Sequence, residues 1–228
     1  MPSPKKSKKT TPVYMLQYWN VRGRAEAIRL TLSLCGLDWT EDHLDDTKIA
    51  EMKKKAGTAE SPFGQWPLLK EDDVVLAQSS AILKHLGRQH GLYGRNKMED
   101  YLIDSFLLGA EAIGSKLSDL IFMHKNSPEA REKFEKEHIL SEAKTGRCGG
   151  AHLAYLEGFL ERSSTEWVAG GKKPSIADIV LFDLFQSILQ YFDAEKPKAL
   201  YPKLTAHQEA VANIEEIAAY LKSEKRPK

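Results

Sequence analysis

The sequence predicts a small α/β domain followed by a domain built only from helices. Segments rich in β-forming residues alternate with segments of helical apolar spacing up to about His90. Beyond a glycine-containing linker at residues 91–96 we find helical patterns but no convincing strand. A chain of 228 residues is long enough for two such domains with buried cores. We therefore expect domains at residues 12–92 and 97–223, after a polar tail at residues 1–11.

The first domain is expected to contain four strands and three helices in the order βαβαββα. A run of β-formers predicts each strand, and apolar residues three or four positions apart predict each helix. The helix at residues 45–56 has the weakest pattern, and Ser79 or Ser80 is the expected N-cap of the last helix. In chain order, the expected elements are residues 13–19, 24–34, 39–44, 45–56, 68–69, 74–76 and 79–90.

The second domain is expected to be all helical. Ser175 to Asp178 form a capping box, with Asp in place of the usual Glu, and we assign this motif to folding. Residues 146–150 are rich in glycine, which disfavours helix interiors, and the sequence offers no physical account of them. The longest apolar stripe consists of Ile103, Phe106, Leu107, Ala110, Ile113, Leu117, Leu120 and Ile121. Shorter helical patterns lie around residues 129–142, 153–160, 179–191 and 211–221.

Composition and charge are ordinary for a globular protein, with 42% hydrophobic and 29% charged residues. No apolar run approaches the roughly 20 residues of a membrane span, and the N-terminus lacks the apolar core of a secretory signal. Removing the four lysines of the tail from the 33 basic residues leaves 29 against 32 acidic residues, which argues against nucleic-acid binding. The tail is expected to be disordered and solvated, with contact to RNA or anionic lipid as the alternative.

The two cysteines, Cys35 and Cys148, belong to no CxxC pair and to no cluster with metal-ligand spacing. Isolated thiols without a secretory signal indicate a reducing compartment, so we expect a cytoplasmic protein that holds no metal. The sequence also contains no P-loop and no GxGxxG motif, which argues against a nucleotide-dependent enzyme.

One run of ten residues, Gln17-Tyr18-Trp19-Asn20-Val21-Arg22-Gly23-Arg24-Ala25-Glu26, closely resembles the Tyr-Phe-x-x-Arg-Gly-Arg-Ala-Glu run that opens the sigma class of glutathione transferases. The resemblance continues in the same order through residues 62–67, 78–82, 101–104, 175–178 and 217–221. It implies a thioredoxin-like N-terminal domain, an all-α C-terminal domain, glutathione as co-substrate, a small electrophile as its acceptor, and a homodimer.

The resemblance makes Tyr18 the residue that activates the thiol of glutathione. A thiol with a pKa of about 8.5 is only a few per cent thiolate at neutral pH. A phenol that donates a hydrogen bond to the sulfur lowers this pKa, and two units correspond to about 2.7 kcal/mol. Arg24 resembles the arginine beside the thiol and is the second expected catalytic residue. The alternatives are a tyrosine that only packs against the sheet and a solvated arginine.

The other glutathione contacts are likewise implied by the resemblance. Pro67 is expected to follow a cis bond and to present the backbone of Trp66 to the tripeptide. Gln78 and Ser79 lie where a strand meets a helix, whose free N–H groups suit a carboxylate. Asp104 is expected to reach across a dimer interface toward the γ-glutamyl amine. The full expected glutathione site is Tyr18, Trp19, Lys54, Gln65, Trp66, Pro67, Gln78, Ser79 and Asp104, and the expected acceptor pocket is Trp19, Val21, Phe106 and Ile113.

The sequence departs from the family pattern in two places. The family usually has a tryptophan and, four residues later, a lysine, both of which contact the glycine end of glutathione. Residues 49–55 stand in the corresponding place in this chain, and they contain no tryptophan. Lys54, or its neighbour Lys53, is the expected substitute. Trp66 stands where a small aliphatic residue is usual, so we expect its bulk to reshape the neighbouring pocket.

The leading hypothesis is an enzyme that adds the glutathione thiolate to hydrophobic electrophiles. A glutathione-dependent isomerase of the prostaglandin D synthase type needs the same thiolate, so the sequence does not separate the two activities. A ligand-binding or structural member of the fold, like the lens crystallins, would be expected to have lost the glutathione contacts, yet Tyr18, Pro67, Gln78, Ser79 and Asp104 are present. The branch of the superfamily that uses a cysteine nucleophile would, by the resemblance, have that cysteine at residues 19–21, which contain none.

Overall fold

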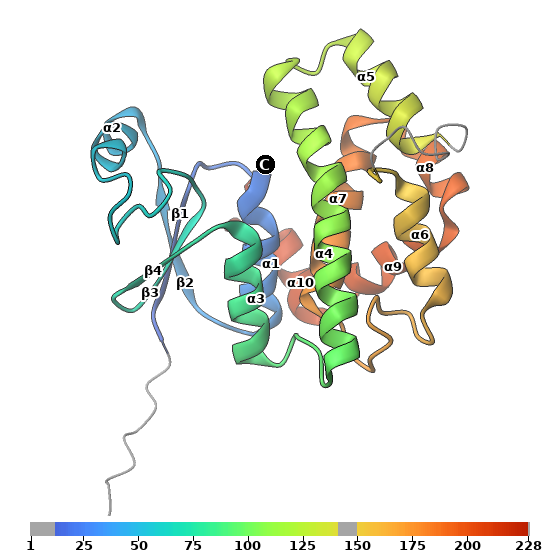
Figure 1. Ribbon diagram of the computed structural model, residues 1–228, viewed down its shortest axis with the longest axis horizontal. Coiled ribbons are helices and arrows are strands. Elements are labelled where there is room, and N and C mark those ends of the chain that lie inside the picture. The colour runs from blue at the N-terminus through green and yellow to red at the C-terminus, as the bar shows by residue number, and fades with distance from the viewer. Residues whose placement is uncertain (1–11, 141–149, 228) are drawn as a thin grey trace, which may run out of the picture.

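The computed structural model describes residues 12–140 and 150–227 (Figure 1). The predictions for the tail at residues 1–11, for Cys148 and for most of the glycine-rich segment at 146–150 lie outside these residues. In the first half, the predicted order of strands and helices is confirmed. Its elements are β1 (Tyr14–Tyr18), η1 (Gly23–Ala25), α1 (Glu26–Leu34), β2 (Trp39–His43), α2 (Asp46–Lys54), β3 (Leu68–Glu71), β4 (Val74–Ala77) and α3 (Ser79–His90).

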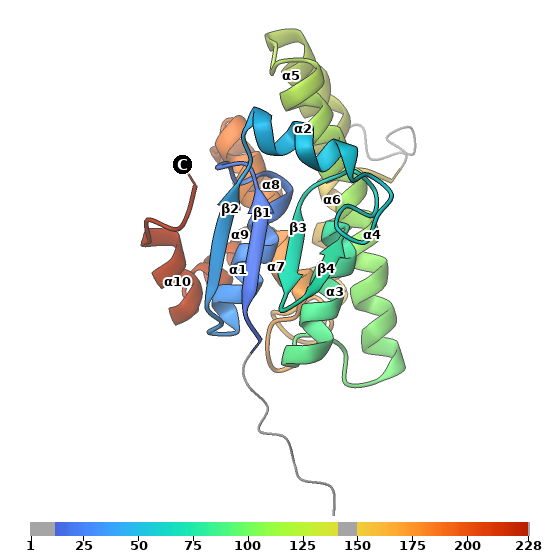
Figure 2. The ribbon, with the colours of Figure 1, turned by 90° about the vertical axis from the view of Figure 1, so that its left-hand side faces the viewer.

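The four strands form one mixed sheet in the order β2-β1-β3-β4. β1 pairs parallel with β2 and antiparallel with β3, and β3 and β4 form the predicted hairpin. Figure 1 shows α1 and α3 between the sheet and the helical half, whereas Figure 2 shows α2 crossing the sheet on its outer side. A parallel pair joined by a helix and completed by a hairpin is the arrangement of a thioredoxin-like domain.

The second half is helical, and no strand follows Ala77 within the described residues. α4 and α7 lie side by side at its centre, and α1 packs against α7 and α10 (Figure 1). No helix of the described chain combines the length and apolarity that crossing a bilayer requires. The elements are α4 (Lys97–Ser118), η2 (Asp119–Met123), α5 (Pro128–Phe134), η3 (Glu135–Ile139), α6 (Leu153–Arg162), α7 (Ile176–Tyr191), α8 (Glu195–Leu200), α9 (Pro202–Ala212) and α10 (Glu215–Lys222).

The prediction of one helix at residues 211–221 is wrong. The chain ends α9 at Ala212 and begins α10 at Glu215, because Ile214 between them has an extended backbone (φ −65°, ψ 128°). α8 and most of α9 were not predicted. Pro197 and Pro202 interrupt the periodic pattern there, although a proline in the first turn of a helix is compatible with it.

The capping box that opens α7 is confirmed. Asp178 is fully buried, and its carboxylate accepts hydrogen bonds from the Ser175 N–H (2.7 Å), the Val168 N–H (2.8 Å) and the His207 imidazole (2.9 Å). These bonds join the start of α7 to the preceding loop and to α9. The motif thus fixes the helix that faces the first domain.

Arg29, on α1, holds in place the loop that follows β1. Its guanidinium is fully buried, forms two hydrogen bonds to Glu41 (2.8 and 3.1 Å), and donates to the carbonyl oxygens of Val21 (3.0 Å) and Arg22 (3.3 Å). Because a buried charge without partners is costly, this arginine constrains the backbone around it. The loop that it fixes leads directly to the candidate site.

Candidate active site

The Tyr18 hydroxyl lies at the end of β1, under the loop that Arg29 anchors. The side chain is 6% exposed, and its oxygen accepts a hydrogen bond from the Arg24 backbone N–H (3.2 Å). A Cβ on Gly23 would lie 2.7 Å from this oxygen, and Gly23 has φ +42°, so glycine is needed here for both space and conformation. No acceptor among the described residues takes the hydroxyl proton. The hydroxyl can therefore donate to a ligand.

A cavity of about 400 Å³ opens beside this loop. Trp19 and Arg24 form one wall, and the segment from Gly64 to Pro67 forms another. The Trp66–Pro67 bond is cis, which confirms the prediction. We call this space the peptide cavity.

The start of α3 completes the peptide cavity. Gln78 has φ +69° and ψ 111°, and its side-chain amide donates to the side-chain Oε1 of Gln65 (3.0 Å) instead of capping the helix. Ser79 is the first residue of α3 and also lines the cavity. The first N–H groups of a helix have no partner within the helix, and they favour an anion. This wall therefore suits a ligand carboxylate.

Trp66 is held by a chain of polar side chains. Its indole N–H donates to Gln17 (3.2 Å), whose amide donates to Asp42 (2.7 Å), which in turn binds the Lys48 ammonium. Burial acts to raise the pKa of Asp42, but the hydrogen bonds from Lys48 and Gln17 outweigh burial and leave this pKa below its usual value. The carboxylate is therefore ionised at neutral pH. The Trp19 ring packs edge-on against the Trp66 ring, at 5.4 Å between centroids. The bulky residue thus forms a fixed wall of the peptide cavity.

A second cavity, of about 340 Å³, lies between the two halves of the molecule. Arg24 and Ser79 line both cavities, so the two spaces adjoin. Leu83, Leu107 and Leu184 are among its apolar residues. We call this space the acceptor cavity. A ligand in it would lie next to a ligand in the peptide cavity.

The structure corrects three of the four predicted acceptor-pocket residues. Val21 lines the acceptor cavity, but Phe106 and Ile113 are fully buried in the helical core, where Phe106 packs edge-on against Phe159. Trp19 lines the peptide cavity instead. The prediction followed the apolar stripe of α4, and that stripe faces the core. The cavity wall on α4 is formed by the adjacent positions Leu107, Ala110, Glu111, Gly114 and Ser115.

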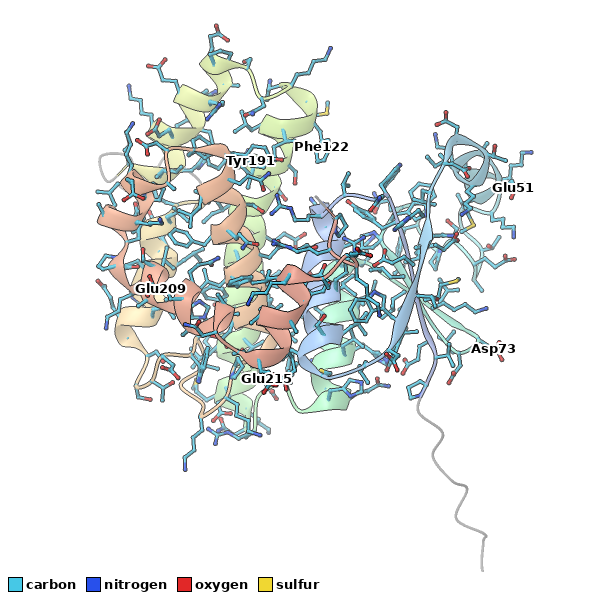
Figure 3. All side chains as sticks on the ribbon, turned by 180° about the vertical axis from the view of Figure 1, so that it is seen from behind. Glu51, Asp73, Phe122, Tyr191, Glu209 and Glu215 are labelled. Carbon is cyan, nitrogen blue, oxygen red and sulfur yellow. The ribbon has the colours of Figure 1, made fainter. Side chains whose placement is uncertain are left out.

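Several acceptor-cavity residues have no sequence signal that could have identified them. Asp183, Ser187 and Gln190 come from α7, a segment in which the sequence predicts only a helix and its capping box. Phe122 belongs to η2, a π-helical turn that continues α4, and lines the cavity together with Tyr191. Figure 3 shows these two aromatic residues close together at one end of the helical half. π-helical turns inside helices are frequent at functional sites.

Arg24 lies between the two cavities. Its guanidinium is 3.5 Å from the Glu111 carboxylate across the acceptor cavity, and Glu111 also accepts a hydrogen bond from Ser80 (3.2 Å). Both charged side chains are partly exposed, so their attraction is screened by water. The guanidinium is thus available to a ligand in either cavity.

Two predicted glutathione contacts lie away from the peptide cavity. Lys54 ends α2 with an exposed side chain and does not line the cavity. Asp104 accepts hydrogen bonds from Lys84 (2.7 Å) and Tyr93 (2.5 Å) on the outer side of α4. Burial acts to raise the pKa of Asp104, but these two partners, Lys84 first, hold it below its usual value. Within one chain, these residues are not brought into the site.

A thioredoxin-like domain, a helical domain and two adjoining cavities beside a tyrosine hydroxyl define a recognisable class of protein. Residues 15–88 match the family model described as "Glutathione S-transferase, N-terminal domain". Residues 117–224 match the model described as "Glutathione S-transferase, C-terminal domain". The chain belongs to the glutathione S-transferase family.

Individual relatives agree with this assignment. The chain is 36% identical over 221 residues to "Glutathione S-transferase P 1" of Xenopus laevis, covering 95% of each sequence. It is 36% identical over 181 residues to "Glutathione S-transferase 1" of Ascaris suum, covering 77% of this chain and 80% of that one. The crystal structure of the glutathione S-transferase from Ascaris lumbricoides superimposes with a TM-score of 0.79 at 30% identity, over 95% of this chain and 98% of that one.

Proposed function

We propose that the protein conjugates the thiolate of glutathione to hydrophobic electrophiles. The supporting observation is the hydrogen bond from the Arg24 N–H to the Tyr18 hydroxyl (3.2 Å), because Arg24 lines both cavities although Tyr18 itself lines neither. Glutathione would occupy the peptide cavity with its γ-glutamyl carboxylate at the start of α3. The electrophile would occupy the acceptor cavity.

In this mechanism Tyr18 donates a hydrogen bond to the sulfur and so favours the thiolate over the thiol. Because the Arg24 N–H already donates to the phenolic oxygen, the hydroxyl proton points away from that contact. The Arg24 side chain adds a positive charge near both cavities, which further stabilises an anionic sulfur. The apolar side chains of the acceptor cavity would hold the electrophile next to it.

The protein is expected to be retained on immobilised glutathione, to be eluted by free glutathione, and to conjugate chlorodinitrobenzene. Gln78→Ala should weaken glutathione binding about tenfold, the usual cost of losing a hydrogen bond to a charged group. Gln89→Ala, at the far end of the same helix, is the matched control and should bind normally. Loss of both retention and conjugation in the wild-type protein would favour the ligand-binding or structural alternative.

The class within the family and the exact reaction are part of the proposal. The motif around Tyr18 resembles the sigma class, whereas the relatives include proteins named P and A. These names support the family and leave the sigma class a prediction. The isomerase alternative requires the same thiolate, so it is distinguished by assaying a prostaglandin endoperoxide beside the conjugation substrate.

We also propose that the protein is a homodimer that uses one face of α4. Tyr101 and Leu108 are 62% and 64% exposed, and helical spacing places Asp104 between them on the same face. Sedimentation equilibrium should give twice the 25.7 kDa mass of one chain. Leu108→Glu should shift the mass toward one chain, whereas Leu200→Glu, at another exposed leucine, should not. A single-chain mass for the wild-type protein would rule out the dimer.

A further inference from the structure

One acidic residue, Asp183, lies on the wall that α7 contributes to the acceptor cavity. Asp183 shares a helical face with Val180, Leu184 and Ser187, and all four line the cavity. The side chain is partly buried, so its carboxyl group is removed from most of the solvent but remains accessible to a ligand. Nothing in the proposed thiolate chemistry uses this carboxyl group.

The arginines around Asp183 are engaged with other partners. Arg22 donates to Gln190, and Arg226 donates to Glu26 (2.8 Å) and to Gln186. Arg29 is committed to Glu41 and to backbone carbonyl oxygens. Among the described residues, Asp183 takes part in no ion pair within 4 Å, and none donates a hydrogen bond to it.

The electrostatic surroundings favour the neutral form of this carboxyl group. Burial, followed by the negative charge of Glu26, raises the pKa of Asp183 to about 8, although Arg22, Arg226 and Arg29 act in the opposite direction. On the far wall, the negative charge of Glu111 is paired with Arg24. These surroundings favour the protonated form of Asp183 at neutral pH, and a protonated carboxyl has an O–H to donate.

We propose that Asp183 is a specificity-determining residue, which donates a hydrogen bond to a carbonyl or similar oxygen of the ligand in the acceptor cavity. The observations that support this are its place in the cavity lining, its lack of a protein partner and the apolar side chains beside it. Arg24 and several serines also line this cavity, but on the α7 wall Asp183 is a donor without a protein partner beside Val180 and Leu184, and it suits a ligand that has an apolar body and an acceptor oxygen. A buried donor left unpaired by a pure hydrocarbon disfavours that hydrocarbon.

This inference adds a substrate class to the proposed function. Its consequence for catalysis rests on the conjugation activity proposed above. The preferred electrophiles would have a carbonyl oxygen attached to an apolar group, and they would be preferred over alkyl halides of the same size. The donor orients the acceptor without forming or breaking a covalent bond. Because ionised Asp183 has no proton to donate, the preference should disappear at alkaline pH.

The test uses two unreactive ligands of the same shape, acetophenone and α-methylstyrene. In α-methylstyrene a CH₂ group replaces the carbonyl oxygen of acetophenone. Their affinities for the full chain are measured by calorimetry without glutathione, at pH 7 and at pH 9. Acetophenone should bind about tenfold more tightly at pH 7, as expected for one hydrogen bond in a buried site. Its affinity should fall about fivefold by pH 9, because most of the Asp183 carboxyl groups have then lost the proton that is linked to binding. The affinity for α-methylstyrene should stay constant.

Two variants separate the donor from the shape of the cavity. Asp183→Asn keeps an N–H donor that does not titrate, so the preference for acetophenone should persist unchanged from pH 7 to pH 9. Asp183→Leu removes the donor and should bind the two ligands equally. Equal binding by the wild-type protein at pH 7, or the same fall with pH in Asp183→Asn, would overturn the inference. Since glutathione is absent, failure of conjugation would leave this result unaffected.

Discussion

Replacing Tyr18 by phenylalanine is expected to raise the pKa of the enzyme-bound glutathione thiol by about two units, from about 6.5 to the free value of about 8.5. The variant loses only the hydroxyl, whose oxygen is oriented by the Arg24 N–H. At pH 6.5 the thiolate fraction, and with it kcat/KM, should fall about 50-fold. At pH 8.5 the loss should shrink to about twofold, because most of the thiol then ionises without help. Ultraviolet titration of the bound thiolate measures the pKa directly.

Tyr14→Phe is the matched control for this experiment. Tyr14 lies on the same strand and is fully buried, but its hydroxyl donates to Glu71 (3.1 Å), outside the residues that line either cavity. Removing it should leave the thiol pKa and the pH profile unchanged, whatever it does to stability. A Tyr18→Phe variant with wild-type turnover between pH 6 and pH 8 would show that another group stabilises the thiolate.

Replacing Asp178 by alanine is expected to lower the free energy of unfolding by about 3 to 5 kcal/mol, the largest stability effect that we predict. The fully buried carboxylate accepts hydrogen bonds from the Ser175 N–H and hydroxyl, the Val168 N–H and the His207 ring. Alanine leaves these donors unpaired in the core and removes the cap of α7. Urea denaturation, followed by circular dichroism, measures the loss.

Asp193→Ala provides the comparison at an exposed site. Asp193 also accepts a hydrogen bond from a backbone N–H close to it in sequence, that of Glu195 (3.3 Å), but its side chain is in solvent. Its replacement should change the free energy of unfolding by no more than about 0.5 kcal/mol. If Asp178→Ala were equally mild, the capping box would not be the main constraint on the start of α7.

Local signals predicted the first domain well. β1, the β3–β4 hairpin and α3 follow from short-range patterns: β-formers in a run, an acidic turn, and apolar residues at helical spacing. The prolines around α8 and the extended residue Ile214 disrupted the same patterns near the C-terminus. There, the short helices are stabilised by packing: α9 against α6 and α7, α8 against α9, and α10 against α1. Periodicity cannot show such contacts.

In the candidate site too, features built by one short segment were predictable from the sequence, and features built by distant segments were not. Gln65, Trp66 and Pro67 come from one short segment, Gln78 and Ser79 from another, and all five line the peptide cavity, while their contact with glutathione stays a prediction. The acceptor pocket was predicted from the apolar stripe of α4, but apolar residues at helical spacing mark the core-facing side. The cavity is lined by neighbouring positions and by residues of α7 that lie far away in the sequence.

By itself, the sequence determined the order of the elements, the capping box of α7 and the family to which the chain belongs, because each of these depends on residues near one another along the chain. Only the tertiary structure decided which faces of α4 and α7 enclose the acceptor cavity and which arginines are already paired around Asp183. Those properties depend on how two separate halves pack together. An aspartate between apolar residues of a helix has the same local sequence whether it meets an arginine, water or a ligand.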